Sequence, residues 1–411
     1  MATALVGAII IDGNGGPPMT DSTIVIENER ISALGPSSQM SVSEGTKVID
    51  TKGKTIIPGL NDGHTHICGE AYPDPAYPLK DLPAYAPIRG VHAARTMLDM
   101  GFTACRGMAD SFYSNVALKQ AIDLGIVPGP RMLVSGMMVG IIGGGASGYI
   151  PPDRYKINEA MFSGPHDARR AVRVQILNGA DFIETMVGGR VGSNARTLPE
   201  DNEWTNEELE AAADETHNRG RRIGANCYSD ETVEACVLAG FDIIEHGCMV
   251  TEKGIATMVD NDVFMVPTLC AYYAYLAPDA EQHYPNYRLA RGRKVAGALR
   301  ANFPKYIAMG LKVAGGSDGV GPGSGRRPGE GAKELELMVE FGMTPMQAIV
   351  ANTKVGADVM GRLNEFGTLE PGKFADLILI DGDPLSDITL LQKREKIQLV
   401  MKGGELIRSD L

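Results

Sequence analysis

The fold is decided by the stretch Pro58-Gly59-Leu60-Asn61-Asp62-Gly63-His64-Thr65-His66. It follows the β-rich run Lys54-Thr55-Ile56-Ile57, which Pro58 and Gly59 end. On an extended chain, residues two apart project to the same side, so His64 and His66 face the same way. Two imidazoles at one strand end can bind one divalent cation, at about 2.0–2.1 Å per bond. The spacing alone indicates either a metal site or two ordinary histidines.

The length and composition bound the fold around this stretch. The chain has 411 residues, 44% hydrophobic and 22% charged, which is typical of a globular protein with one large and one smaller domain. The net charge of −12 argues against nucleic acid or an anionic membrane surface as a partner. The sequence shows no signal-like N-terminal segment and no apolar run long enough to span a bilayer.

The cysteines indicate a compartment. The six cysteines include no C-x-x-C pair and are sparse for this length, as in proteins with free thiols in a reducing environment. We therefore expect a cytoplasmic enzyme that acts on a small-molecule substrate, and we expect a homo-oligomer.

Outward from the histidine pair, the sequence pattern alternates. Residues 2–52 read as short strands with hairpin-like spacing, and strand-like runs return at 374–380 and 397–402. Between them, helix-like runs that each precede an apolar strand-like run lie at 91–100, 115–124, 167–178, 205–219, 231–239, 253–261 and 287–309. With the strand that ends near Asp62, these make eight βα steps, which favour a closed (β/α)₈ TIM barrel over an open sheet. Both termini would then join in one small sheet domain beside the barrel.

In a barrel the C-terminal ends of all strands meet at one mouth, where barrel enzymes place their chemistry. The polar residues at these predicted ends are His64, His66, Glu184, Asn226, Tyr228, His246 and Asp318. Each has an ordinary alternative: Glu184 and Asp318 can cap the following helices, and His246 can bond to backbone. Together, the three histidines, the glutamate and the aspartate favour a metal site.

At this point the chain resembles the amidohydrolase superfamily, in particular its imidazolonepropionase-like and Xaa-Pro dipeptidase-like branch. The motifs run in the family's order over nearly the whole chain: 58–66, 101–103, 179–183, Ile244-Glu245-His246-Gly247, 316–318 and 367–377. The resemblance implies a barrel catalytic domain at 58–362 and a composite β-sandwich built from 1–57 and 363–411. It also implies hydrolysis of a carbon–nitrogen bond by a metal-activated water.

The resemblance also implies roles for single residues. His64 and His66 look like ligands of the more buried metal, and Asp318 like a ligand of that metal and the base for the water. His246 looks like a ligand of a second metal, or a group that polarises the substrate.

Two positions depart from the branch. The fourth strand usually carries a lysine that becomes carboxylated and bridges two metals, but here it carries Glu184. The fifth strand usually carries a ligand histidine, but here it carries Asn226, followed two residues on by Tyr228. An amide oxygen is a poorer zinc ligand than imidazole. We therefore keep two hypotheses: one cation at His64, His66, Glu184 and Asp318, or two cations bridged by Glu184 with Asn226 as a ligand.

The leading interpretation is a zinc-dependent amidohydrolase, with manganese or cobalt as alternatives, that cleaves an amide, cyclic amide or dipeptide-like bond. One alternative is a deaminase of an N-heterocycle. Another, from a different class, is a non-hydrolytic lyase or isomerase that uses the same metal. Tyr228, Tyr272 and Arg190 are candidate substrate contacts. The loops at 70–89, 137–163 and 269–287 form either a lid or ordinary packed loops.

Overall fold

The computed structural model describes residues 2–69, 82–147, 159–192, 197–278, 280–320 and 329–411. The predicted loops at 70–89 and 137–163 therefore lie partly outside the described residues. None of the helices in the described ranges is long and apolar enough to cross a membrane.

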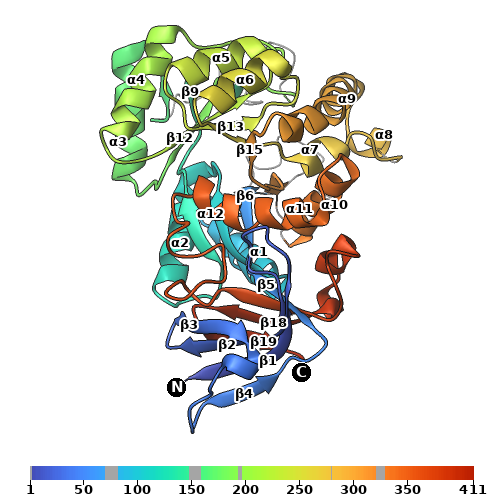
Figure 1. The fold of residues 1–411 in the computed structure, drawn as a ribbon. Coiled ribbons are helices and arrows are strands. Elements are labelled where there is room, and N and C mark those ends of the chain that lie inside the picture. The colour runs from blue at the N-terminus through green and yellow to red at the C-terminus, as the bar shows by residue number, and fades with distance from the viewer. Residues whose placement is uncertain (1, 70–81, 148–158, 193–196, 279, 321–328) are drawn as a thin grey trace.

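Strands from both ends of the chain form one sheet, blue and red at one end of the molecule in Figure 1. Its strands are β1 (Thr3–Ile10), β2 (Met19–Glu27), β3 (Arg30–Pro36), β4 (Lys47–Asp50), β5 (Thr55–Pro58), β17 (Leu377–Ile380), β18 (Ile397–Lys402) and β19 (Glu405–Ser409). They follow the order β19-β18-β17-β5-β1-β2-β3, with β4 paired to β1. β5 runs antiparallel to β17, with Ile57 opposite Ile378. The N-terminal and C-terminal strands therefore share one sheet, next to the start of the histidine stretch.

The other strands pair only in parallel within the described residues. They are β6 (Leu60–His66), β7 (Phe102–Gly107), β8 (Arg131–Val134), β9 (Val139–Ile141), β10 (Met161–Phe162), β11 (Ile183–Met186), β12 (Ile223–Cys227), β13 (Ile243–His246), β14 (Phe264–Val266), β15 (Lys312–Val313) and β16 (Gly319–Val320). One sheet has the order β10-β9-β11-β12-β13-β14-β15, and the other β16-β6-β7-β8. Parallel pairing requires crossover connections, and α-helices lie in those that join β6 to β7, β7 to β8, β11 to β12, β12 to β13 and β13 to β14.

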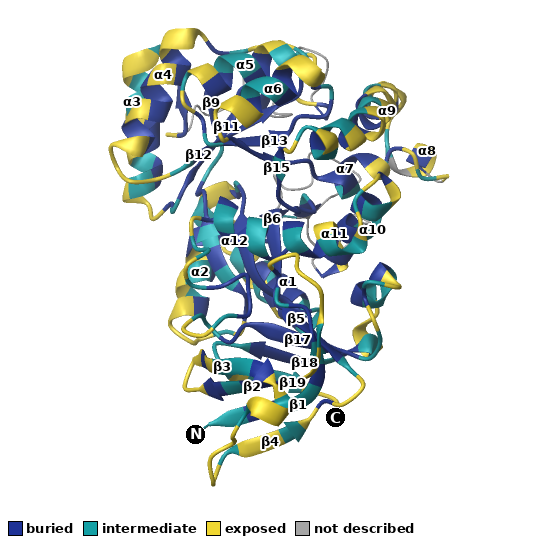
Figure 2. Ribbon diagram, in the orientation of Figure 1, coloured by how far each residue is buried: buried dark blue, intermediate teal, exposed yellow. Residues whose placement is uncertain are grey.

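Helices lie between these strands, as the alternating pattern predicts. They are α1 (Tyr85–Asp99), α2 (Ser114–Asp123), α3 (Pro165–Leu177), α4 (Asn206–His217), α5 (Asp230–Leu238), α6 (Glu252–Asp260), α7 (Leu269–Tyr273), α8 (Ala280–His283), α9 (Asn286–Ala308), α10 (Lys333–Glu340), α11 (Pro345–Ala351) and α12 (Lys354–Val359). Short 3₁₀ turns lie at Ser37–Gln39, Ser111–Tyr113, Gly145–Ser147, Glu330–Ala332, Ile388–Gln392 and Arg394–Lys396. In Figure 2, exposed residues gather on one side of α3 to α6, while the neighbouring strands β11, β12 and β13 are buried.

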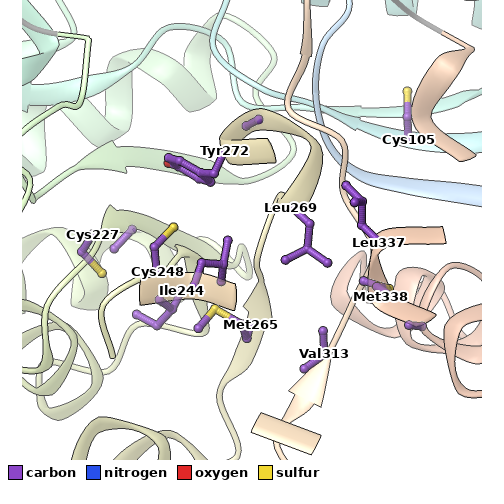
Figure 3. Packing of buried hydrophobic residues seen from close by; sticks show 14 of the residues in the cluster. Cys105, Cys227, Ile244, Cys248, Met265, Leu269, Tyr272, Val313, Leu337 and Met338 are labelled. Carbon is purple, nitrogen blue, oxygen red and sulfur yellow. The ribbon is translucent and has the colours of Figure 1, made fainter. Parts of the chain in front are cut away.

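The core fills the space between strands and helices. Ile244, Met265 and Val313 stand in register on β13, β14 and β15 and belong to one buried cluster, part of which Figure 3 shows. Fully burying side chains of this kind contributes about 1.5–3 kcal/mol each. These apolar contacts fix the strands whose ends carry the polar residues of the site.

Backbone hydrogen bonds cross from one parallel sheet to the other. The N–H of Gly63 on β6 donates to the carbonyl of Gly315 after β15, at 2.8 Å, and the N–H of Asp181 donates to the carbonyl of Val134 on β8, at 2.7 Å. A Cβ on Gly63 would lie 2.6 Å from the Gly315 oxygen, so the approach requires glycine there. Hydrogen bonds thus connect residues next to β15 and β11 in one sheet with β6 and β8 in the other. β6 lies against the segment that carries Asp318.

Candidate metal centre

The histidine pair at the end of β6 presents two nitrogen lone pairs. Nδ1 of His64 lies 2.8 Å from Oε2 of Glu245, and Nδ1 of His66 lies 2.9 Å from the carbonyl oxygen of Ala109. Both partners accept hydrogen bonds, so each Nδ1 carries the proton that it donates. Each Nε2 is therefore the nitrogen that can bind a metal, and the partners of Nδ1 fix the orientation of both rings.

Nε2 of His64 is a buried polar atom without a hydrogen-bond partner among the described residues. The side chain of His64 is 0% exposed. A buried polar atom without a partner costs about 1–3 kcal/mol. A cation at this point would satisfy it.

Glu184 on β11 completes a group of metal-ligand type. Ligand atoms of His64, His66 and Glu184 all lie within 4.8 Å of one another. Oε2 of Glu184 is held in place by the backbone N–H of Ala109 at 2.5 Å and by Oγ of Ser135 at 3.1 Å. The structure thus places three of the predicted ligands together. Two imidazole nitrogens and a carboxylate oxygen are donors that suit zinc.

Asp318 lies at the open side of this group. Its Oδ1 is 3.4 Å from Nε2 of His66 and 3.8 Å from Nε2 of His64, and its side chain is 19% exposed. The N–H of Asp318 donates to the carbonyl of His64 at 2.7 Å, which ties its position to β6. Asp318 therefore lies close enough to the two histidines to share a cation with them, and its side chain is partly exposed to solvent.

The electrostatics of the group favour a cation. Burial lowers the pKa of His66, but the hydrogen bond to Asp318 and the charges of Asp318, Glu184 and Asp110 outweigh it and raise that pKa to about 9. For Asp110, burial has the opposite sign and raises the pKa to about 6, although the charge of His66 acts to lower it. The carboxylates around His66 thus bind positive charge, which a divalent cation can supply instead of a proton.

Asn226 and His246 lie beside this group but face each other. Nδ2 of Asn226 lies 3.1 Å from Oε1 of Glu184 and 3.0 Å from the carbonyl oxygen of Thr185. Oδ1 of Asn226 lies 2.8 Å from Nε2 of His246, whose Nδ1 lies 2.7 Å from Oγ1 of Thr268. Burial lowers the pKa of His246 to about 3, so its imidazole is neutral.

Three residues of the site have left-handed backbone. The φ angles are 72° at His246, 50° at Thr268 and 48° at Asp318. Such a conformation costs a non-glycine residue on the order of 1–3 kcal/mol and tends to occur at functional sites. Here it turns side chains of three segments toward one place.

The predicted aromatic contacts surround His246. The ring of Tyr228 stacks on His246 at 5.4 Å between centroids, and the ring of Tyr272 meets it edge-on at 5.6 Å. The hydroxyl of Tyr272 donates to that of Tyr228 at 3.2 Å, and both side chains are buried. Burial raises the pKa of Tyr228, and Tyr272 and the charge of Arg190 oppose that effect. Arg190 itself is exposed, within electrostatic reach of Tyr228.

Sequence reasoning missed a buried ion pair behind His64. Nη2 of Arg106 on β7 lies 2.8 Å from Oε1 of Glu245 on β13, and both side chains are at most 1% exposed. Burial raises the pKa of Glu245, but the positive charge of Arg106 and the hydrogen bonds from Arg106 and His64 outweigh it and lower that pKa to about 2. A charged residue inside each of two apolar strands, with opposite signs, is the signal that could have predicted this pair.

Known proteins share this architecture. A model described as the amidohydrolase family matches residues 55–407. Ochratoxinase of Aspergillus niger is 26% identical over 99% of this chain and 86% of its own length. Imidazolonepropionase of Alkaliphilus oremlandii is 25% identical over 94% of this chain and 90% of its own. The crystal structure of a Xaa-Pro dipeptidase with methionine bound in its active site is 28% identical, with a TM-score of 0.92 over 100% of both chains.

These similarities agree with the strands, helices and site described above. The relatives imply a TIM-barrel-like α/β fold. In this chain, parallel strands bring His64, His66 and Glu184 to one place. The predicted branch, with its imidazolonepropionase-like and Xaa-Pro dipeptidase-like members, is confirmed. The match over residues 55–407 shows that the chain is a hydrolase of carbon–nitrogen bonds and belongs to the amidohydrolase family.

Proposed function

We propose that this protein is a metal-dependent hydrolase that cleaves an amide, cyclic amide or dipeptide-like bond. The observation that carries the proposal is the buried Nε2 of His64, which has no hydrogen bond among the described residues and lies close to His66 and Glu184. The family generally uses divalent metals, and the names of the relatives, ochratoxinase, imidazolonepropionase and Xaa-Pro dipeptidase, support this range of bonds.

His64, His66 and Glu184 would hold the cation, with Asp318 as a fourth ligand. Nitrogen and carboxylate donors in this number favour zinc, and manganese or cobalt would also suit them. A divalent cation held there supplies Lewis acidity, which polarises a carbonyl and makes water nucleophilic at neutral pH.

Asp318 is the residue we assign to proton transfer. Its carboxylate takes a proton from the attacking water, whose oxygen bonds to the carbonyl carbon, and gives that proton to the nitrogen that leaves. Its position at the exposed side of the group gives it access to a substrate. His246, which is neutral and held by Asn226 and Thr268, would form a fixed wall of the site beside His64, with 5.1 Å between the ring centroids.

Tyr228, Tyr272 and Arg190 would contact the rest of the substrate. The two buried tyrosines form an aromatic wall beside His246, which suits a flat or apolar group. The guanidinium of Arg190, exposed near this wall, suits a substrate carboxylate.

A product analysis in isotopically heavy water tests this function. Zinc-loaded protein should be offered N-acyl amino acids, Xaa-Pro dipeptides and cyclic amides, and the products analysed by mass spectrometry. We expect amine release with heavy oxygen in the new carboxylate. Product without heavy oxygen would support the lyase or isomerase alternative, and ammonia release from an amino-substituted heterocycle without amide turnover would support a deaminase. Either result would contradict the proposal.

The proposal extends to the arrangement of domains. Residues 58–362 would form a closed (β/α)₈ barrel, and 1–57 with 363–411 a composite β-sandwich. The hydrogen bonds from Gly63 to Gly315 and from Asp181 to Val134 support closure. The pairing of β5 with β17 supports the composite domain.

A further inference from the structure

We propose that this protein holds one divalent cation per chain. A second cation would need Asn226 and His246 as ligands, but these two side chains are hydrogen-bonded to each other. The inference deepens the proposed function and rests on it for the first cation, at His64, His66 and Glu184. It concerns the groups next to Glu184, on the ends of β12 and β13.

The amide of Asn226 has one orientation. Its Nδ2 lies 3.0 Å from the carbonyl oxygen of Thr185 and 3.1 Å from Oε1 of Glu184. A backbone carbonyl can only accept a hydrogen bond, so the NH₂ group must lie on this side. Asn226 therefore presents hydrogens, and no lone pair, to the space beside Glu184.

The same orientation fixes the proton on His246. Oδ1 of Asn226, which can only accept, lies 2.8 Å from Nε2 of His246, so Nε2 carries a proton and donates it. With the proton on Nε2, Nδ1 is the acceptor of the neutral ring. It lies 2.7 Å from Oγ1 of Thr268 and accepts a hydrogen bond from that hydroxyl. Both ring nitrogens are thus used, and neither offers a lone pair to a cation.

Glu184 lacks the capacity to bridge two cations. A carboxylate has about four lone-pair positions, two on each oxygen. Oε2 already accepts from the N–H of Ala109 and from Oγ of Ser135, and Oε1 accepts from Asn226. Glu184 can give its remaining position to the cation beside His64 and His66, but it has none for a second.

The rings around His246 hold it in this arrangement. Tyr228 lies almost parallel to it, at 11°, and Tyr272 meets it at 83°. Both tyrosines are buried and hydrogen-bonded to each other. Rotation of His246 toward Glu184 would break bonds to Asn226 and Thr268 and displace two packed rings.

Metal analysis of purified full-length variants tests this inference. After saturation with zinc sulfate and removal of free zinc, we expect one zinc per chain in the wild type and two in Asn226→His, since imidazole restores a lone pair beside Glu184. Asn261→His, an exposed position at the end of α6, is the matched control and should retain one zinc. Two zinc ions in the wild type, or one in folded Asn226→His, would overturn the inference.

A second variant keeps the test decisive if Asn226→His does not fold. His246→Ala should hold one zinc with the wild-type affinity, because His246 is not a ligand, whereas His66→Ala should lose zinc. Loss of zinc from folded His246→Ala would overturn the inference. Failure of the proposed function would look different: a chain that holds one zinc and hydrolyses no amide.

Discussion

Glu245 holds His64 in place. Its Oε2 accepts a hydrogen bond from Nδ1 of His64 at 2.8 Å, while its Oε1 is paired with Arg106 at 2.8 Å. Arg106 also donates to the carbonyl of Gly63, one residue before His64, at 3.0 Å. Hydrogen bonds thus link Arg106 through Glu245 to the imidazole of His64, whose Nε2 faces the proposed metal position. Such partners fix the ring and raise its basicity as a ligand.

We predict that Glu245→Gln weakens zinc binding by about 10–100-fold, because an amide orients His64 without the negative charge. Competition with a zinc-binding dye measures the affinity. Glu210→Gln, on an exposed position of α4, should leave the affinity unchanged. Wild-type affinity in folded Glu245→Gln would show that Glu245 does not support the site.

Arg106 should matter for stability. Arg106→Met leaves Glu245 buried without its cation, and removal of one partner of a buried ion pair costs about 3–5 kcal/mol. Urea unfolding of the protein with zinc removed measures the change. Arg293→Met, which breaks an ion pair with Glu281 at the surface, should cost less than about 1 kcal/mol. Equal effects of the two substitutions would contradict a buried pair.

Asp318 should control the rate of the reaction. Asp318→Asn keeps the size of the side chain but cannot accept the proton, so we predict a fall in kcat of about 10²–10⁴-fold. Zinc content is measured in parallel, since His64, His66 and Glu184 should retain the cation. Asp260→Asn, at the exposed end of α6, serves as the control. Undiminished kcat in a zinc-containing Asp318→Asn protein would rule out this role.

Glu334 should make stability depend on pH. Burial raises its pKa from 4.5 to about 8, although the backbone N–H groups of Leu269 and Cys270 act to lower it. Because the folded state binds this proton more tightly, the stabilisation is complete below pH about 4.5 and is lost as pH rises to about 8. Glu334→Gln, which cannot ionise, should therefore lose less stability over this range.

Thermal unfolding of both proteins at several pH values measures this difference. Glu340→Gln, at the exposed end of the same helix, should follow the wild type. Parallel pH curves for the wild type and Glu334→Gln would show that Glu334 does not retain its proton in the folded protein.

The sequence carried enough to bring the metal group together. His64, His66 and Glu184 stand at ends of parallel strands, and such ends meet at one edge, so their grouping follows from the alternation of helices and strands. The orientation of Asn226 could not be predicted, because it depends on the carbonyl of Thr185 and on His246, which only the folded chain brings near.

The starts of the helices likewise include some that the sequence predicts and some that it does not. Thr205 and Glu208 form a capping box at the start of α4, a signal in the sequence, and the predicted start agrees. α1 begins at Tyr85, six residues before the predicted 91, because Ala84 provides no side-chain cap to mark the start. The closed barrel and the composite sandwich stay predictions, since the described strands pair as two parallel sheets and one mixed sheet.

X-ray absorption at the zinc edge tests the central claim most directly, because it reads the ligands of the bound cation. For the zinc-loaded wild type, we predict imidazole nitrogens and carboxylate oxygens at about 2.0–2.2 Å and no sulfur. The imidazole signal should be lost together with the zinc in His66→Ala. A sulfur ligand at about 2.3 Å, or an unchanged spectrum in His66→Ala, would contradict a metal centre at His64, His66 and Glu184.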